Sequence, residues 1–264
     1  LAESYSMDAE TYYLTGCVAL AMDSYDEASS NFTEAYGEDA TYDRAIQIYE
    51  AYLEKDMEAD GTRYLEAALK TEAKNAEDYC NRGKVYYYME DYSNAQKELT
   101  EAVNQKSTEG MLLLGMVYRA QGDTSNARSM YQQYVSADGS EPAKGYNGLA
   151  LCDMDDGSYD SALENISKGL EDASTEEMQD LLFNEIVVYE KKLDFATALS
   201  KMQEYIKMFP DDENAAKELT FLQSRNGELS NDTASDTTEN TDAEAASDAG
   251  DAADTSDEAG EEEY

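Results

Sequence analysis

Few residues in this sequence could carry out covalent or metal chemistry. It contains no histidine and three cysteines, Cys17, Cys80 and Cys152, which are widely separated and each lie in an apolar stretch. The absence of histidine excludes imidazole acid–base catalysis, Ser-His and Cys-His nucleophiles and His-ligated metal sites. Scattered thiols without a CxxC pair are typical of small core residues, not of a disulfide framework or a zinc site. The sequence also has no glycine-rich phosphate loop.

One acidic stretch has the residue types of a calcium loop but not the spacing. It contains Asp153, Asp155, Asp156 and Gly157, and the glycine comes too early if Asp153 is the first ligand. The residues from Tyr159 onward already predict a helix. We therefore predict no metal site, no cofactor and no catalytic residues, and we expect that the protein is not an enzyme.

Acidic side chains dominate the composition, with 59 Asp and Glu against 19 Lys and Arg and a formal net charge of −40. Residues 1–225 contain 45 of the acidic residues and all of the basic ones. A field of this sign repels phosphates and anionic headgroups, which argues against nucleic-acid and membrane-surface partners. The longest apolar run, residues 111–118, is too short to cross a bilayer. Basic proteins or cations are the compatible partners, and the sequence leaves the oligomeric state open.

The last part of the chain, residues 226–264, has a different composition from the rest. It contains 14 acidic residues, no Lys or Arg, and Leu229 as its only large aliphatic side chain. A segment with so little apolar surface and so much unbalanced charge cannot bury a core. We therefore predict a folded body over residues 1–225 and a disordered, acidic, low-complexity tail over residues 226–264.

A pair of residues recurs six times along the body, a small residue followed four positions later by a larger apolar one. The pairs are Ala28/Phe32, Gly61/Leu65, Ala95/Leu99, Ala127/Tyr131, Ala162/Ile166 and Ala198/Met202. The first members are 33, 34, 32, 35 and 36 residues apart, and a stretch with helical periodicity precedes each pair. Small residues allow two helices to approach closely, so we expect the glycines of the first helices, such as Gly16, to face the small residues of the pairs, such as Ala28. Each unit therefore predicts two antiparallel helices joined by a tight turn.

This repeat resembles the tetratricopeptide repeat. The period, the small residue in the middle of the first helix, the Ala-x3-aromatic pattern of the second helix and the closing Pro210 carry the resemblance over about residues 9–212. It implies an all-α, right-handed superhelical solenoid of about six helix hairpins, with repeats starting near residues 9, 42, 76, 108, 143 and 179, and a capping helix over residues 213–225. The sequence departs from the family in having no Trp.

The resemblance also implies where a partner would bind. In this family the first helix of each hairpin lines a concave channel, and transferring the channel positions gives a set that is mostly apolar or aromatic. The candidate partner-binding residues are Tyr13, Ile46, Lys84, Tyr87, Tyr88, Leu112, Met116, Arg119, Lys144, Asn147, Leu151, Phe183, Val187 and Lys191. Apolar and aromatic anchors suit a peptide or a helix of a partner protein. The alternative, that some of these residues belong to the core of a shifted register, remains open.

Two further observations bear on the kind of partner. The family's clamp for a partner's C-terminal carboxylate uses Lys and Asn, but Tyr13, Cys17, Ile46 and Glu50 occupy those positions here, so we do not expect an adaptor for chaperone tails. Four basic residues, Lys84, Arg119, Lys144 and Lys191, fall on channel positions, and they could form a seat for an acidic ligand.

These observations predict a non-catalytic protein–protein interaction scaffold that binds a peptide or helix in its channel. The alternative is a ligand-sensing or carrier subunit that binds an acidic ligand at the central basic residues. Bacterial surface lipoproteins and envelope-assembly proteins often resemble this combination of helical repeats and an acidic tail. We therefore expect a bacterial envelope or extracellular location, with an N-terminal signal already removed before Leu1, and a cytoplasmic location as the alternative.

Overall fold

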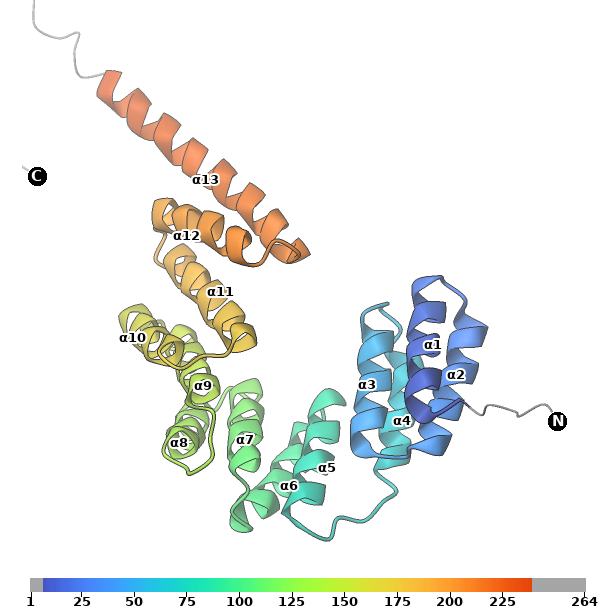
Figure 1. Cartoon of the computed structure of the whole chain (residues 1–264). Helices are drawn as coiled ribbons and strands as arrows, with labels where there is room; N and C mark the ends of the chain where they lie inside the picture. The colour runs from blue at the N-terminus through green and yellow to red at the C-terminus, as the bar shows by residue number, and fades with distance from the viewer. Residues whose placement is uncertain (1–6, 239–264) are drawn as a thin grey trace, which may run out of the picture.

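The computed structural model describes residues 7–238, and all regular secondary structure in that range is helical (Figure 1). The helices are α1 (Ala9–Ala21), α2 (Tyr25–Glu38), α3 (Tyr42–Leu53), α4 (Glu58–Ala68), α5 (Ala76–Tyr88), α6 (Tyr92–Asn104), α7 (Thr108–Ala120), α8 (Thr124–Val135), α9 (Pro142–Asp155), α10 (Tyr159–Leu170), α11 (Thr175–Lys191), α12 (Phe195–Met208) and α13 (Glu213–Thr238). Each odd-numbered helix up to α11 packs against the helix that follows it, and α13 packs against α12. The predicted all-α solenoid of helix hairpins is confirmed.

The first helix of a hairpin begins where a side chain can accept a hydrogen bond from an unpaired amide. Asp8, Thr41, Asn75 and Ser107 each accept from the backbone N–H three residues later, at the starts of α1, α3, α5 and α7. At the start of α11, Ser174 and Glu177 form a reciprocal capping box. This box starts α11 at Thr175, four residues before the expected start near 179.

The turn inside each of the six hairpins has one left-handed residue at its tip. These residues are Asp23, Asp56, Glu90, Gly122, Gly157 and Leu193, with φ between 56° and 78°. The amide of the next residue donates to a carbonyl five residues back in every turn, for example from Asp194 to Tyr189 at 2.9 Å. This hydrogen bond is the mark of a Schellman ending, which terminates a helix and reverses the chain within a few residues. A single type of turn therefore gives all six hairpins their short connection.

Glycines on the first helices make room for large side chains from the second helices. A Cβ at Gly16 would lie 2.6 Å from the ring of Phe32, and one at Gly115 would lie 2.6 Å from the ring of Tyr131. We expected the small residue of each pair to face these glycines, but the larger residue four positions later fills the space. The glycines are thus needed for the close approach of a bulky side chain, since any Cβ would overlap it.

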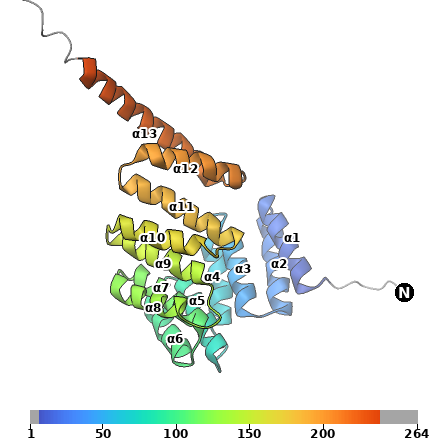
Figure 2. The same cartoon turned by 60° about the vertical axis from the view of Figure 1, so that its left-hand side comes forward.

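The hairpins stack along a curved path, which Figure 2 shows from a second side. Their apolar faces form a series of adjoining clusters, such as the one that joins Phe32 of α2, Ile48 and Tyr52 of α3 and Val85 of α5. Between α4 and α5, Arg82 donates from Nη1 to the carbonyls of Leu69 (2.9 Å) and Thr71 (2.6 Å). This arginine therefore ties the longer connection at residues 69–75 to the third repeat.

The thiols and the end of the described chain also bear on the expectations from sequence. Cys80 and Cys152 are buried, and burial raises the pKa of each to about 11, so both behave as small core residues.

Helix α13 continues to Thr238, thirteen residues beyond the expected end at Arg225. The helix therefore overlaps residues 226–238 of the segment predicted to be disordered, and the disorder of the tail stays a prediction. Residues 239–264 of the predicted tail lie outside the described range.

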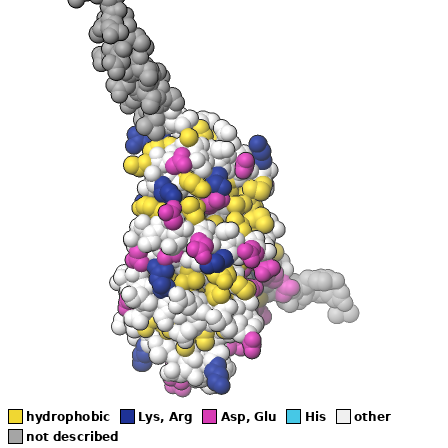
Figure 3. Space-filling view, turned by 90° about the vertical axis from the view of Figure 1, so that its left-hand side faces the viewer, with side chains coloured by type: hydrophobic (Ala, Val, Ile, Leu, Met, Phe, Trp, Pro, Cys, Tyr) yellow, Lys and Arg dark blue, Asp and Glu magenta, His cyan; other side chains and the backbone are white. Residues whose placement is uncertain are grey.

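The outer surface of the C-terminal repeats carries side chains of mixed type. Figure 3 shows this side with acidic and basic side chains interspersed among scattered apolar ones. Within residues 7–238, none of the helices is both long enough and apolar enough for a transmembrane span.

Candidate functional site

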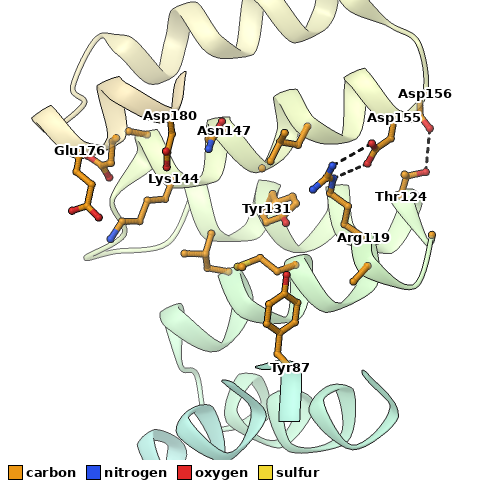
Figure 4. Close-up of a pocket in the computed structure, with 18 residues that line it drawn as sticks. Tyr87, Arg119, Thr124, Tyr131, Lys144, Asn147, Asp155, Asp156, Glu176 and Asp180 are labelled. Carbon is orange, nitrogen blue, oxygen red and sulfur yellow. Dashed lines mark hydrogen bonds and ion pairs between the residues drawn. The ribbon is translucent and has the colours of Figure 1, made fainter. Parts of the chain in front are cut away.

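A pocket of about 760 Å³ lies among the first helices of the third to sixth repeats (Figure 4). Tyr87 of α5 lies at one side and Glu176 and Asp180 of α11 at another. The remaining lining residues come mostly from α7 and α9, with Gly122, Thr124 and Tyr131 from the turn after α7 and from α8. Its volume falls in the range of sites that enclose a ligand of drug size, so it can hold a short segment of a partner.

The floor of the pocket is apolar and is built around Tyr131. This tyrosine is on a second helix, α8, but its ring passes between Gly115 of α7 and Gly148 of α9. A Cβ on either glycine would lie 2.6 Å from the ring, and Tyr131 is only 2% exposed. Leu112, Met116 and Leu151 line the pocket beside it. The two glycines thus hold a rigid aromatic floor between neighbouring repeats.

Arg119 crosses one end of the pocket and is held by a carboxylate of the next repeat. Its Nε and Nη2 donate to the two oxygens of Asp155 at 2.6 and 3.2 Å, as the dashed lines in Figure 4 show. The hydrogen bonds and the charge of Asp155 raise the pKa of Arg119, although burial opposes that shift. At the same end, Thr124 donates to Asp156 at 3.2 Å. These contacts join α7, α8 and α9, and they pair the charge of Arg119 with Asp155.

Three carboxylates line the opposite end of the pocket, Glu176, Glu177 and Asp180 of α11. Glu177 accepts from the amide of Ser174 at 2.7 Å through Oε2, while its Oε1 is buried without a hydrogen-bond partner. Burial, followed by the charges of Glu176 and Glu177, raises the pKa of Asp180. The raised pKa means that this end of the pocket disfavours additional negative charge.

Half of the sequence-predicted channel residues come together in this pocket. They are Tyr87, Leu112, Met116, Arg119, Lys144, Asn147 and Leu151. Lys144 forms an ion pair with Glu141, and the side-chain oxygen of Asn147 accepts from Asn184 at 2.7 Å. Their role in binding stays a prediction.

The other predicted residues lie outside the pocket. Ile46 is 2% exposed, so its assignment as an accessible contact is wrong; α3 is covered by neighbouring repeats, and Ile46 packs into the core of the first two. Tyr13 packs near Phe32, Tyr88 donates to Glu50, and Phe183 packs against Tyr205. Lys84 and Val187 are partly buried, and Lys191 is exposed.

The structure also brings residues to the pocket that the sequence reasoning missed. Tyr131 was counted as packing, because a position on a second helix is expected to face away from the channel. Glu176 and Glu177 were missed because the helix was expected to start near 179. The Ser-x-x-Glu signal at residues 174–177 could have located the true start.

The acidic stretch at residues 153–157 serves a structural purpose in the fold. Asp153 is 4% exposed and accepts from Arg128 at 2.6 Å and from Asn165 at 2.7 Å. Arg128 also donates to Asp156 at 2.9 Å. Asp153 therefore joins α8, α9 and α10, and its oxygens are engaged by these donors.

The fold and the pocket define a class of protein, a solenoid of helix hairpins whose first helices line a common cleft. Residues 80–142 and 112–176 match the model of the tetratricopeptide repeat family. Residues 80–176 therefore resemble tetratricopeptide repeats, as the sequence predicted, and the helix hairpins in the rest of the described chain have the same arrangement. Proteins of this family generally act as non-catalytic scaffolds that bind proteins or peptides.

Solved structures share the fold at low sequence identity. A tetratricopeptide repeat protein from Parabacteroides merdae aligns with a TM-score of 0.62 and 15% identity, over 84% of this chain and 87% of that one. The type IV pilus biogenesis factor PilW gives a TM-score of 0.52 and 14% identity over 80% and 98%. A chain of the Cut9–Hcn1 hetero-tetramer of the APC/C aligns with a TM-score of 0.52 and 17% identity. The alignment covers 84% of this chain and 44% of that one. No curated protein sequence matches this chain.

Proposed function

We propose that this protein is a non-catalytic scaffold that binds a peptide or a helix of a partner protein in the pocket formed by α5, α7, α9 and α11. The carrying observation is the lining of that pocket, which first helices of four successive repeats share around an apolar floor. Aromatic and flexible apolar anchors, here Tyr87, Met116 and Leu151, are the side chains that supply most binding energy at protein interfaces. The generally non-catalytic character of the family supports the same conclusion.

The alternative, an acidic ligand at the basic channel residues, has less support from the geometry. Arg119 is engaged by both oxygens of Asp155, and Lys144 is paired with Glu141. The lining has two basic side chains against five acidic ones. An acidic ligand would have to displace these ion pairs and approach the remaining carboxylates, which makes the site unfavourable for it.

The test compares matched substitutions inside the pocket and on an outer helix. A partner recovered by crosslinking in the native host is purified, and its affinity is measured by isothermal titration calorimetry. Met116→Ala with Leu151→Ala should cost about 2 kcal/mol, or roughly thirtyfold in Kd. Met208→Ala is the control, because Met208 lies half-exposed on α12. If the partner binds the double variant as tightly as the parent and Met208→Ala releases it, the binding site is on the outer face.

A further inference from the structure

The α11 end of the pocket is acidic, in contrast to the apolar middle. Leu112, Met116 and Leu151 line its middle, whereas Glu176, Glu177 and Asp180 form the end that belongs to α11. Among the described residues, no ion pair reaches Glu176 or Asp180. This end therefore presents carboxylates whose charge the protein itself leaves without a cation in contact.

The arrangement of these carboxylates is unfavourable in the empty protein. Glu176 and Asp180 are four residues apart on one helix, so their side chains are neighbours of like charge on one face. Glu177 adds a third charge, and its buried Oε1 has no hydrogen-bond partner. A bound cation that could donate hydrogen bonds to the accessible carboxylate oxygens would relieve the repulsion.

The basic residues of the pocket provide that relief only in part, because the charge of Glu177 acts on Lys144 without an ion pair between these two residues. The Lys144 ammonium is paired with Glu141, which lies before α9, and Arg119 is held by Asp155 at the far end. The pocket is thus complementary to a segment that carries positive charge at one end and an apolar group at the other.

Resting on the function proposed above, we infer that the pocket recognises a partner segment in which a Lys or Arg lies close to an apolar anchor. The anchor packs on Met116 and Leu151 against the Tyr131 floor. The cation donates to Glu176 and Asp180, beside the charge of Glu177. Specificity for a basic partner then comes from carboxylates at fixed positions of one pocket, in addition to the negative field of the whole chain.

The experiment must separate the pocket carboxylates from the general acidity of the chain. A displayed library of random peptides is selected against the full-length protein, and the selected peptides are synthesised with a fluorescent label. Their affinities are measured by anisotropy for the parent, for Glu176→Gln with Asp180→Asn, and for Glu34→Gln with Glu66→Gln. The last pair removes the same charge from exposed positions on α2 and α4, outside the pocket lining. Thermal melts establish that all variants fold.

The inference predicts selected sequences in which Lys or Arg lies close to Leu, Met or an aromatic residue. It also predicts that the pocket double variant binds them about tenfold more weakly, which corresponds to ~1.4 kcal/mol. The distant double variant should lose less than about twofold, because screening over more than a Debye length removes most of its effect. Peptides rich in Asp or Glu, no sequence preference, or equal losses in the two variants would overturn the inference.

The same peptides distinguish failure of this inference from failure of the proposed function. If they ignore the carboxylates but lose affinity for Met116→Ala with Leu151→Ala, the pocket is a binding site without the basic preference. If they bind that variant as tightly as the parent, binding occurs elsewhere and both proposals fail.

Discussion

Replacing Gly148 by Ala tests whether the Tyr131 floor is as tightly held as the geometry indicates. The added methyl would lie 2.6 Å from Cδ1 and Cε1 of Tyr131, well inside an ordinary contact of at least 3.4 Å. The ring has little room to move, because a Cβ at Gly115 would also lie 2.6 Å from its Cε1. The methyl must therefore displace either the ring or helix α9.

The magnitude follows from two opposing effects. Overpacking a rigid core costs typically 1–3 kcal/mol, and the double constraint on Tyr131 places this site near ~3 kcal/mol. Ala also favours the helix over Gly by about 1 kcal/mol. We therefore expect a net loss of about 2 kcal/mol in the free energy of unfolding. The displaced ring should also reduce the affinity of the pocket for its partner.

A matched control isolates the overlap from helix propensity. Gly37 lies in α2, and a Cβ there would meet no atom within 4 Å. Gly37→Ala should therefore stabilise the protein by up to about 1 kcal/mol. Urea unfolding of both variants, followed by circular dichroism, gives the difference directly.

A second background shows whether Tyr131 is the cause. Tyr131→Leu removes the ring, so Gly148→Ala in that background should be close to neutral or stabilising, a strong departure from additivity. If Gly148→Ala destabilises both backgrounds equally, or neither, the glycine clamp on Tyr131 does not exist as described.

Two other predictions concern α11 and the turn after it. Burial and the neighbouring Glu218 raise the pKa of Glu190 from 4.5 to about 7. The folded state therefore binds the proton more tightly than the unfolded state, and the free energy of unfolding falls as pH rises from about 4.5 through 7. Glu190→Gln should remove ~1–2 kcal/mol of that fall, allowing for partial exposure, as thermal melts at pH 5 and pH 8 would show; an unchanged pH profile would contradict it. Leu193 has a φ of 60° and is 72% exposed, so its left-handed backbone is strained and Leu193→Gly should stabilise the protein by ~0.5–1 kcal/mol in urea unfolding. Gly157 has a φ of 72°, so Gly157→Ala should destabilise the protein. The opposite order of stabilities would refute the backbone strain at these positions.

The sequence predicted the fold because its local signals agree with one another. The small-and-large pairs, such as Ala95 with Leu99, recur at a nearly constant spacing, and both members of that pair are fully buried. Hydrophobic periodicity and turn chemistry pointed to the same hairpin in each unit. The sequence did not indicate which side chain packs against each glycine. That depends on which side chain of the second helix reaches across, and Phe32 and Tyr131 do so where Ala28 and Ala127 were expected.

The candidate site was less predictable, since it depends on the relative position of neighbouring repeats. Arg119 lines the pocket, but its pairing with Asp155 is a contact across 36 residues that no local pattern indicates. Ile46 was misplaced because α3 buries a wider face than the transferred positions assume. Glu176 and Glu177 were missed because the start of α11 was placed about one helical turn too late.

The sites where the protein departs from local consistency are informative about its function. The Asp153 network shows that this chain pairs buried acidic groups when they serve the fold, since Arg128 and Asn165 both donate to it. Glu176 and Asp180 have no comparable partner, although Lys144 lies on the same pocket and is paired outward with Glu141. Two like charges on one helical face weaken that helix unless something binds them. Since unfavourable groupings of this kind are expected at functional sites, the α11 end of the pocket is where a partner's cation should be sought.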